Sequence, residues 1–154
     1  MERIVLELQE VPRFVAPPDF TVRRLASADV HHLWGLTSDL RWIANTWGGP
    51  AGLAASGYAW GAFIQSKLVS VACTFLVGSE SEDLGVVTES GYRGRGLAAV
   101  CGAALCQDAR ARGHRATWTT SSDNQASLRV AEKLGFKVQG REILYILGQP
   151  ALVP

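Results

Sequence analysis

The stretch GYRGRGLAAVCGAAL, residues 91–105, places three glycines and two arginines directly before a long apolar segment. From Leu97 onward the apolar residues recur at three- and four-residue spacing, which predicts a helix that ends near Gly113. The first turn of a helix carries unpaired N–H groups and the positive end of the helix dipole. Glycines let these groups approach a ligand closely, and guanidinium groups add positive charge. The stretch therefore predicts an anion-binding helix N-terminus, with a flexible loop and two solvated arginines as the plainer alternative.

The segments around this helix alternate between strand and helix patterns. Strands are predicted over residues 84–88 and 115–120, and a second helix capped by Asp123 or Asn124 runs to Gly135. One or two further strands are predicted over residues 136–147.

The N-terminal half is predicted to consist mainly of antiparallel strands, over residues 2–8, 20–25, 58–65 and 68–77. Ser27 is the expected N-cap of a helix with Val30, Leu33, Trp34 and Leu36 on one side, and residues 37–56 are loosely patterned. Together the elements predict an α/β fold with one central sheet covered by helices, in a single domain over residues 1–154.

Composition excludes several classes of protein. The 154 residues carry a net charge of +1 without a basic block, which argues against a nucleic-acid binder. No apolar run is long enough to span a membrane, and the N-terminus lacks a signal-peptide core, so a cytoplasmic location is expected. Cys73, Cys101 and Cys106 lack metal-site spacing and are expected to be small buried hydrophobes. The pair at residues 31–32, His-His, also lacks a complete ligand set, so no metal is expected.

Two phosphate-binding motifs fit the glycine-rich turn poorly. A P-loop requires Lys followed by Ser or Thr where Leu97 and Ala98 stand. Residues 94–99 do spell the relaxed dinucleotide fingerprint G-x-G-x-x-A, and Asp123 ends a following strand. In the dinucleotide fold, the fingerprint strand opens the domain and a tight turn leads from it to the first glycine. Here several residues separate the strand from Gly94, and about 80 residues precede the strand. A nicotinamide site stays open only as a weaker alternative.

Residues 93–98, Arg-Gly-Arg-Gly-Leu-Ala, match the pattern Arg/Gln-x-x-Gly-x-Gly/Ala. A second pattern, Asn-x-x-Ala/Ser ending in Gly-Phe, is matched by Asn124, Ser127, Gly135 and Phe136. On these two motifs the stretch 84–136 resembles the GNAT superfamily of acyl-CoA-dependent N-acyltransferases, in particular the branch that includes antibiotic-resistance acetyltransferases.

The resemblance implies a central mixed, mostly antiparallel sheet that is splayed at the cofactor strand and flanked by helices. It implies that the amides of residues 95–98 and the Arg93 side chain hold the pyrophosphate of acetyl-CoA, and that residues 86–88 pair with the pantetheine arm. The residues expected to bind acetyl-CoA are therefore Val86, Val87, Thr88, Arg93, Gly94, Arg95, Gly96, Leu97, Ala98, Asn124 and Ser127. Helix capping is the plainer role for Asn124.

The implied reaction is direct attack of a small-molecule amine on acetyl-CoA. Glu82 and Asp83 lie near the position where some family members carry a catalytic glutamate, and Glu89 is a weaker candidate base. The plainer interpretation of the sequence ESED, residues 80–83, is a solvated acidic turn. The family often has a tyrosine acid where this chain has Ala131, which leaves Ser127, Tyr145 or water to protonate the leaving thiolate.

Acceptor selectivity in the superfamily usually resides in the first helical region and the strand hairpin. The candidates there are Asp39, Trp42, Trp47 and Trp60, with ordinary packing as the alternative for the tryptophans. A small-molecule amine acceptor is expected, with no nucleic acid and no membrane, and a homodimer stays open. The alternative function is a catalytically silent acyl-CoA-binding sensor or regulatory subunit, which the alanine at position 131 keeps open.

Overall fold

The computed structural model describes residues 1–143, and these form one sheet with helices on both faces. The strands are β1 (Glu2–Leu8), β2 (Thr21–Arg24), β3 (Ala59–Ile64), β4 (Lys67–Val77), β5 (Ser81–Thr88), β6 (Arg115–Ser121) and β7 (Phe136–Ile143). The α-helices are α1 (Val30–Trp34), α2 (Pro50–Ala55), α3 (Leu97–Ala111) and α4 (Gln125–Leu134), and the 3-10 helices are η1 (Ser27–Asp29), η2 (Ser38–Trp47) and η3 (Ser90–Tyr92).

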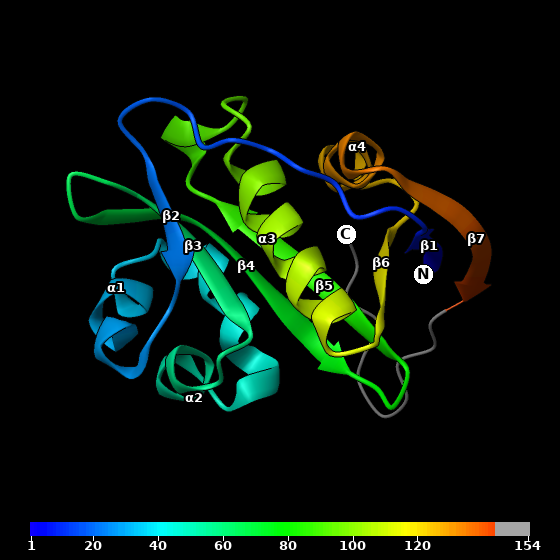
Figure 1. Ribbon diagram of the computed structural model, residues 1–154, viewed down its shortest axis with the longest axis horizontal. Helices are drawn as coiled ribbons and strands as arrows, with labels where there is room; N and C mark the ends of the chain where they lie inside the picture. Colours follow the sequence, from blue (N-terminus) through cyan, green and yellow to red (C-terminus); the bar gives the residue numbers. More distant parts are fainter. Residues whose placement is uncertain (144–154) are drawn as a thin grey trace.

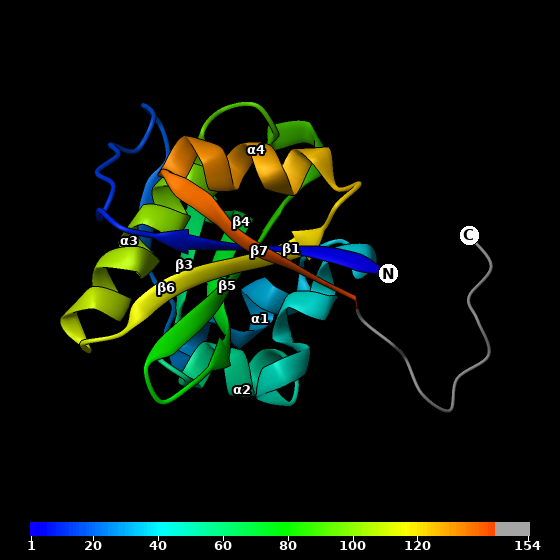
Figure 2. The same ribbon diagram turned by 90° about the vertical axis from the view of Figure 1, so that its right-hand side faces the viewer.

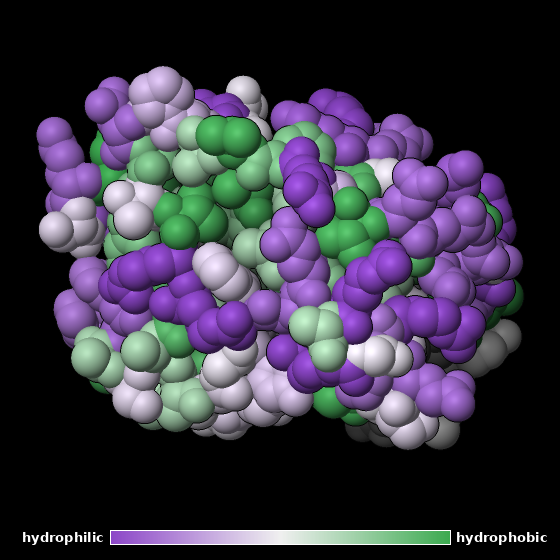
Figure 3. Space-filling view, viewed as in Figure 1, coloured by the Kyte–Doolittle hydropathy of each residue, from purple (hydrophilic) through white to green (hydrophobic). Residues whose placement is uncertain are grey.

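The sheet has the strand order β2-β3-β4-β5-β6-β1-β7, and of these pairs only β5–β6 is parallel. Helices α3 and α4 cover one face, while α1, η2 and α2 cover the other (Figures 1 and 2). On the face that carries α3, apolar groups gather in two areas with a polar band between them (Figure 3). The expected α/β fold with a mixed, mostly antiparallel sheet is confirmed.

Both faces of the sheet bury apolar side chains, in two clusters. One cluster lies under α3 and α4 and includes Leu97, Leu105 and Trp118; the other lies under η2 and includes Ile43 and Leu53. The three cysteines are free and buried within these clusters, as expected, and burial raises the pKa of each thiol to about 12.

The parallel pair β5–β6 separates part-way along its length. Its register runs from Ser81 opposite Arg115 to Leu84 opposite Trp118. Beyond that point β5 stays paired with β4 as far as Thr88, and β6 stays paired with β1. A bulge in β4, between residues 74 and 76, lies beside the split and bends that strand. The splay expected for the cofactor strand is therefore present.

Two local predictions were wrong in the N-terminal half, and one stretch without a predicted element is ordered. Residues 37–56 are mostly helical, as η2 and α2, because their buried apolar residues pack on the sheet although their spacing is irregular. Ala26, not Ser27, precedes η1, and the Asp29 carboxylate accepts from the Ala26 N–H at 2.8 Å. Trp34 does not join the buried side of its helix; it is 56% exposed, with Arg41 over its ring.

Close packing around β3 leaves no room for a side chain at Gly61. A Cβ at this position would lie 2.6 Å from Leu68 Cδ1 and 2.9 Å from Leu25 Cδ2, and both leucines are buried. Gly61→Ala should therefore lower the free energy of unfolding by about 1–3 kcal/mol through overpacking. Urea denaturation measures this. Gly140→Ala on β7 is the matched control, since a Cβ there would meet no described heavy atom within 4 Å, and its change should stay within about 0.5 kcal/mol. Equal stability of the two variants would contradict the packing argument.

Candidate functional site

The split between β5 and β6 opens a cleft of about 260 Å³, called the β5–β6 cleft below. Its walls come from the four strands β1, β4, β5 and β6, from η2 and from the start of α4. The lining residues are Arg3, Trp42, Phe75, Leu76, Asp83, Leu84, Gly85, Val86, Trp118, Thr119, Thr120, Asn124 and Ser127. Since β5 has no strand partner on its β6 side beyond Leu84, its backbone edge from Gly85 to Thr88 is available to a ligand.

Residues 89–96 connect β5 to α3 and form the glycine-rich loop. Gly94 and Gly96 have φ values of +77° and +79°, in the left-handed region where a side chain would be strained. Gly96 is the N-cap of α3, and since glycine has no side chain, this residue makes no side-chain cap hydrogen bond to the helix end. The amides of the first turn, Leu97 and Ala98 among them, are thus left for an external acceptor. Arg93 lies against the end of β5, with its Nε donating to the Thr88 carbonyl at 3.2 Å.

A further cation reaches this loop from another helix. Lys133, in the last turn of α4, comes close enough that a Cβ on Gly96 would lie 3.5 Å from its Nζ. Arg95 lies over the Tyr92 ring, 5.4 Å from its centroid. Sequence reasoning missed Lys133, because only the packing of α4 on α3 brings residue 133 to residue 96. Together with the helix dipole, these side chains make the loop strongly favourable for an anion.

The start of α4 forms one side of the cleft. The Asn124 side chain accepts from the Ser127 N–H at 3.1 Å, so it caps the helix as the plainer interpretation held. The Ser127 hydroxyl accepts from Trp118 Nε1 at 2.9 Å. Both residues also line the cleft, so the capping role and a ligand-binding role are compatible.

Asp83 is the carboxylate that faces the cleft. Its Oδ1 accepts from the Thr117 hydroxyl at 2.7 Å and from the Thr119 hydroxyl at 2.8 Å. Burial raises the pKa of Asp83, although the two hydroxyls and the positive charge of Arg3 oppose the rise. A half-buried carboxylate with a raised pKa, in a cleft, is suited to accept a proton.

Glu82 lies on the opposite face of β5 and is fully buried. Its oxygens accept from Arg112 Nε at 2.8 Å, from Arg112 Nη2 at 2.6 Å and from the Thr74 hydroxyl at 2.8 Å. His114 Nδ1 lies 2.9 Å from Glu82 Oε2, the oxygen that also accepts from Arg112 Nε. Burial alone would raise the pKa of Glu82, but these hydrogen bonds and the Arg112 charge lower it overall. The solvated turn expected here is wrong, and we assign Glu82 a structural role instead of a catalytic one.

The structure also accounts for Glu89, the weaker candidate base, and for Ala131, at the position of the family's tyrosine. The Glu89 carboxylate accepts from the Thr37 N–H at 3.0 Å and from the Thr37 hydroxyl at 2.6 Å, so it ties the end of β5 to the start of η2. Ala131 is fully buried against α3, where it belongs to the core. Tyr145 lies outside the described residues.

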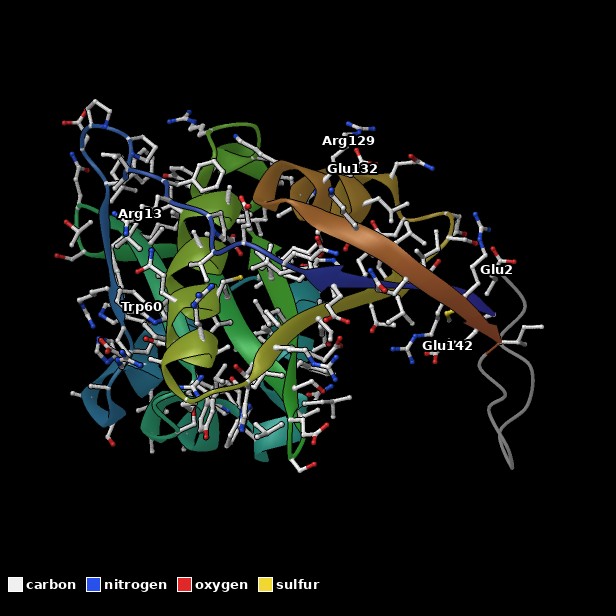
Figure 4. The ribbon with its side chains drawn as sticks, turned by 45° about the vertical axis from the view of Figure 1, so that its right-hand side comes forward. Glu2, Arg13, Trp60, Arg129, Glu132 and Glu142 are labelled. Atoms are coloured by element: carbon white, nitrogen blue, oxygen red, sulfur yellow. The ribbon has the colours of Figure 1, made fainter. Side chains whose placement is uncertain are left out.

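Of the four residues expected to contact the acceptor, the structure brings Trp42 to the cleft. Its ring packs edge-on against Phe75, with the centroids 5.6 Å apart. Trp47 instead donates to the Thr74 carbonyl at 2.9 Å and stacks on Tyr58. Trp60 donates to Asp108 at 2.8 Å, near the β2 end of the sheet and far from β7 (Figure 4). Asp39 is exposed at the start of η2 and is not a lining residue.

The fold and the site define an acyltransferase-like α/β class, and comparison with known proteins agrees. The model of the GNAT acetyltransferase family matches residues 7–145, and the chain therefore belongs to that family. A Streptomyces virginiae protein, described as an uncharacterized N-acetyltransferase in the mutA 5′ region, is 42% identical over 106 residues, which are 68% of this chain and 44% of that protein. The matched residues thus span less than half of that relative's length.

Solved structures of GNAT proteins share the fold. A GNAT-family acetyltransferase structure from Novosphingobium aromaticivorans superposes with a TM-score of 0.66 and 25% identity, covering 91% of this chain and 61% of that one. The aminoglycoside N-acetyltransferase AAC(6')-Iy, solved in complex with CoA, gives a TM-score of 0.63 at 24% identity and covers 89% of this chain and 98% of that one. The family assignment removes the nicotinamide alternative, and residues 89–96 indeed form no tight strand-to-helix turn.

Residues 1–143 contain neither a metal-ligand cluster nor a membrane-spanning helix. No group of three or more His, Cys, Asp or Glu side chains in this range is arranged to hold a metal ion. Within the same range, no helix has the length and hydropathy needed to cross a membrane.

Glu82→Gln should lower the free energy of unfolding at neutral pH by about 3 kcal/mol. This is the low end of the usual cost of breaking a buried ion pair, because Arg112 reaches solvent. The folded-state pKa of Glu82 is lowered. Its ionised carboxylate therefore stabilises the fold at pH values above the unfolded-state pKa of about 4.3. That contribution is lost as the pH falls through the folded-state pKa.

Urea denaturation between pH 7 and pH 3 tests this. The stability difference between the wild type and Glu82→Gln should narrow on acidification. Glu7→Gln is the control, because Glu7 makes only a 3.5 Å pair with the exposed Arg115 and should cost no more than about 1 kcal/mol. A difference that stays constant over this pH range would show that the ionised Glu82 is not what stabilises the fold.

Proposed function

We propose that this chain is an N-acetyltransferase that moves an acetyl group from acetyl-CoA to the amine of a small molecule. The observation that carries the proposal is the arrangement around β5. One end of its free edge leads to a helix N-terminus with open amides, and the other end leads to the carboxylate of Asp83.

The glycine-rich loop is the proposed site for the pyrophosphate of acetyl-CoA. Open amides at the start of α3 would donate to the phosphate oxygens, and Arg93 and Lys133 would supply positive charge. The positive φ values of Gly94 and Gly96 support this, because they bring backbone close to the ligand without a Cβ in the way.

The pantetheine arm would occupy the β5–β6 cleft. Its amide groups can pair with the free backbone edge of β5 between Gly85 and Thr88, as an added strand would. An N–H on this edge can also donate to the thioester carbonyl, where such a donor contributes ~2.7–4 kcal/mol as charge develops on oxygen. Asn124 and Ser127 would then lie beside the arm and the sulfur.

Asp83 is the proposed base. An aliphatic amine has a pKa of ~10.4 and must lose a proton before its nitrogen can attack. The carboxylate of Asp83, directly or through one water, would accept that proton as the new C–N bond forms and the C–S bond breaks. Ser127 Oγ already accepts from Trp118, so its own proton can be donated toward the departing sulfur. With a thiol pKa of ~8.5, the thiolate can also leave unaided.

The named relatives support this assignment of substrates. A CoA complex and a complex with a CoA–acetylneamine bisubstrate analogue have been solved for AAC(6')-Iy, whose fold this chain shares. A small-molecule amine is therefore the acceptor class that we propose here.

A catalytically silent acyl-CoA-binding sensor or subunit is the second candidate. The buried Ala131 favours it, because the family often has a tyrosine acid at this position. Release of free thiol from acetyl-CoA across a panel of amines separates the two functions. A silent binder would be stabilised by acetyl-CoA against thermal unfolding but would give no amine-dependent thiol.

Changing Arg93 to Glu and Gly96 to Val together should abolish the stabilisation by acetyl-CoA. The valine would be strained at a φ of +79°, and the glutamate would repel phosphate. Thermal unfolding with increasing acetyl-CoA measures the effect. Arg13→Glu, in the loop over the C-terminal half of α3, is the charge-matched control and should leave the shift unchanged (Figure 4). An undiminished shift in the double variant would locate the cofactor elsewhere.

Asp83→Asn should lower kcat by roughly 10²–10⁴-fold, the usual contribution of a general base. The amide oxygen can still accept from Thr117 and Thr119, so the fold and the KM for acetyl-CoA should change little. In the wild type, kcat/KM should fall as the pH drops through the raised pKa of Asp83, because the base becomes protonated. The steady-state pH profile of the variant should lack this decline, and an unaltered profile would assign the base to another group.

A further inference from the structure

Arg3 brings a positive charge into the β5–β6 cleft from the first strand. It pairs with Ser121 across β1 and β6, so it lies on the same face of the sheet as Thr119 and Thr117, the hydroxyl partners of Asp83. Both Arg3 and Asp83 line the cleft, and the charge of Arg3 acts on the Asp83 carboxylate. The cleft therefore holds a cation and an anion on one wall.

The Arg3 guanidinium retains binding capacity. Its Nε lies 3.5 Å from Glu142, which is longer than a good hydrogen bond, and 26% of its side chain is exposed. Glu142 lies at the far end of β7, beside the start of β1 (Figure 4). Arginine binds carboxylates through two parallel N–H groups, and such a pair can form here without breaking a short internal bond.

The part of the cleft lined by η2 and β4 is apolar and partly open. Trp42 from η2 packs on Phe75 from the β4 bulge, and Leu76 follows it. Trp42 is 43% exposed and Leu76 is 54% exposed, so the mouth of the cleft presents uncovered apolar surface. Large apolar side chains gathered at a cleft mouth mark a surface that a ligand covers.

We propose that the acceptor is an α-amino acid with an apolar side chain. Its amine would lie at Asp83, its carboxylate at Arg3, and its side chain against Trp42 and Phe75. This inference rests on the proposed N-acetyltransferase function and narrows its substrate class.

The charge of the cleft separates this class from amines that carry no carboxylate. Arg3 has Glu142 as a distant ion-pair partner, and the Glu142 charge also acts on Asp83. A zwitterion places its carboxylate on Arg3 and its amine on Asp83, whereas an amine without a carboxylate leaves the Arg3 guanidinium without a close anionic partner from the ligand.

The test compares each amino acid with the amine that lacks its carboxylate. The pairs are phenylalanine with phenethylamine, tryptophan with tryptamine, and leucine with 3-methylbutylamine; kanamycin represents polycationic acceptors. Free-thiol release from acetyl-CoA gives kcat/KM for each compound. At least one amino acid should exceed its decarboxylated partner by about tenfold or more, since a charge-assisted bidentate contact contributes at least ~1.4 kcal/mol.

Arg3→Gln should abolish this preference. The kcat/KM of the preferred amino acid should fall about tenfold, mainly through KM, while that of its partner amine changes less than about threefold. Losing Arg3 also affects the ionisation of Asp83, but this affects both compounds alike, so their ratio is the readout. Arg141→Gln on β7 is the matched control, because Arg141 pairs with Glu2 and is not a lining residue of the cleft.

The outcomes separate this inference from the function it rests on. Turnover of kanamycin or of the simple amines in preference to every amino acid overturns the inference and leaves the transferase function standing. Stabilisation by acetyl-CoA with no turnover of any amine overturns both. An amino-acid preference that survives in Arg3→Gln overturns the role of Arg3.

Discussion

The parallel pairing of β5 with β6 stops at Leu84 and Trp118, and the site depends on that interruption. Backbone groups that lose a partner within a sheet must find another, so the free edge of β5 favours a ligand that itself carries amide groups. The bulge in β4 lies beside the split and places Phe75 in the cleft. An uninterrupted pair would have filled the same space with hydrogen bonds and left no cleft.

The buried ion pair of Glu82 with Arg112 stands directly beside the split and holds its closed end together. Glu82 bonds to β4 through Thr74 and to the end of α3 through Arg112, while its neighbour Asp83 faces the cleft. Two successive carboxylates on one strand thus have separate tasks, since alternate side chains point to opposite faces of a sheet. Glu82 links β5 to β4 and to the end of α3, whereas Asp83 is available in the cleft to accept a proton.

The two ends of β5 differ in the charged groups that surround them. The end next to α3 carries Arg93, Lys133 and an open helix N-terminus, which suit a phosphate group. The other end has Asp83 and Arg3 within an otherwise largely apolar or hydroxyl-lined cleft. A molecule that is anionic at one end and reactive at the other would fit this gradient, and acetyl-CoA has that character.

The sequence by itself determined the local features: the helix after the glycine-rich loop, the Asn124 cap, the buried cysteines and the strands around them. Each follows from spacing or from the chemistry of neighbouring residues. Only the tertiary structure decided that Glu82 is buried and Asp83 accessible, that Trp42 rather than Trp47 or Trp60 reaches the cleft, and that Arg3 and Lys133 join the site. Strand register and helix packing bring residues 3, 83 and 119 together, and 96 with 133, and no pattern within one segment encodes which distant segment will lie beside it.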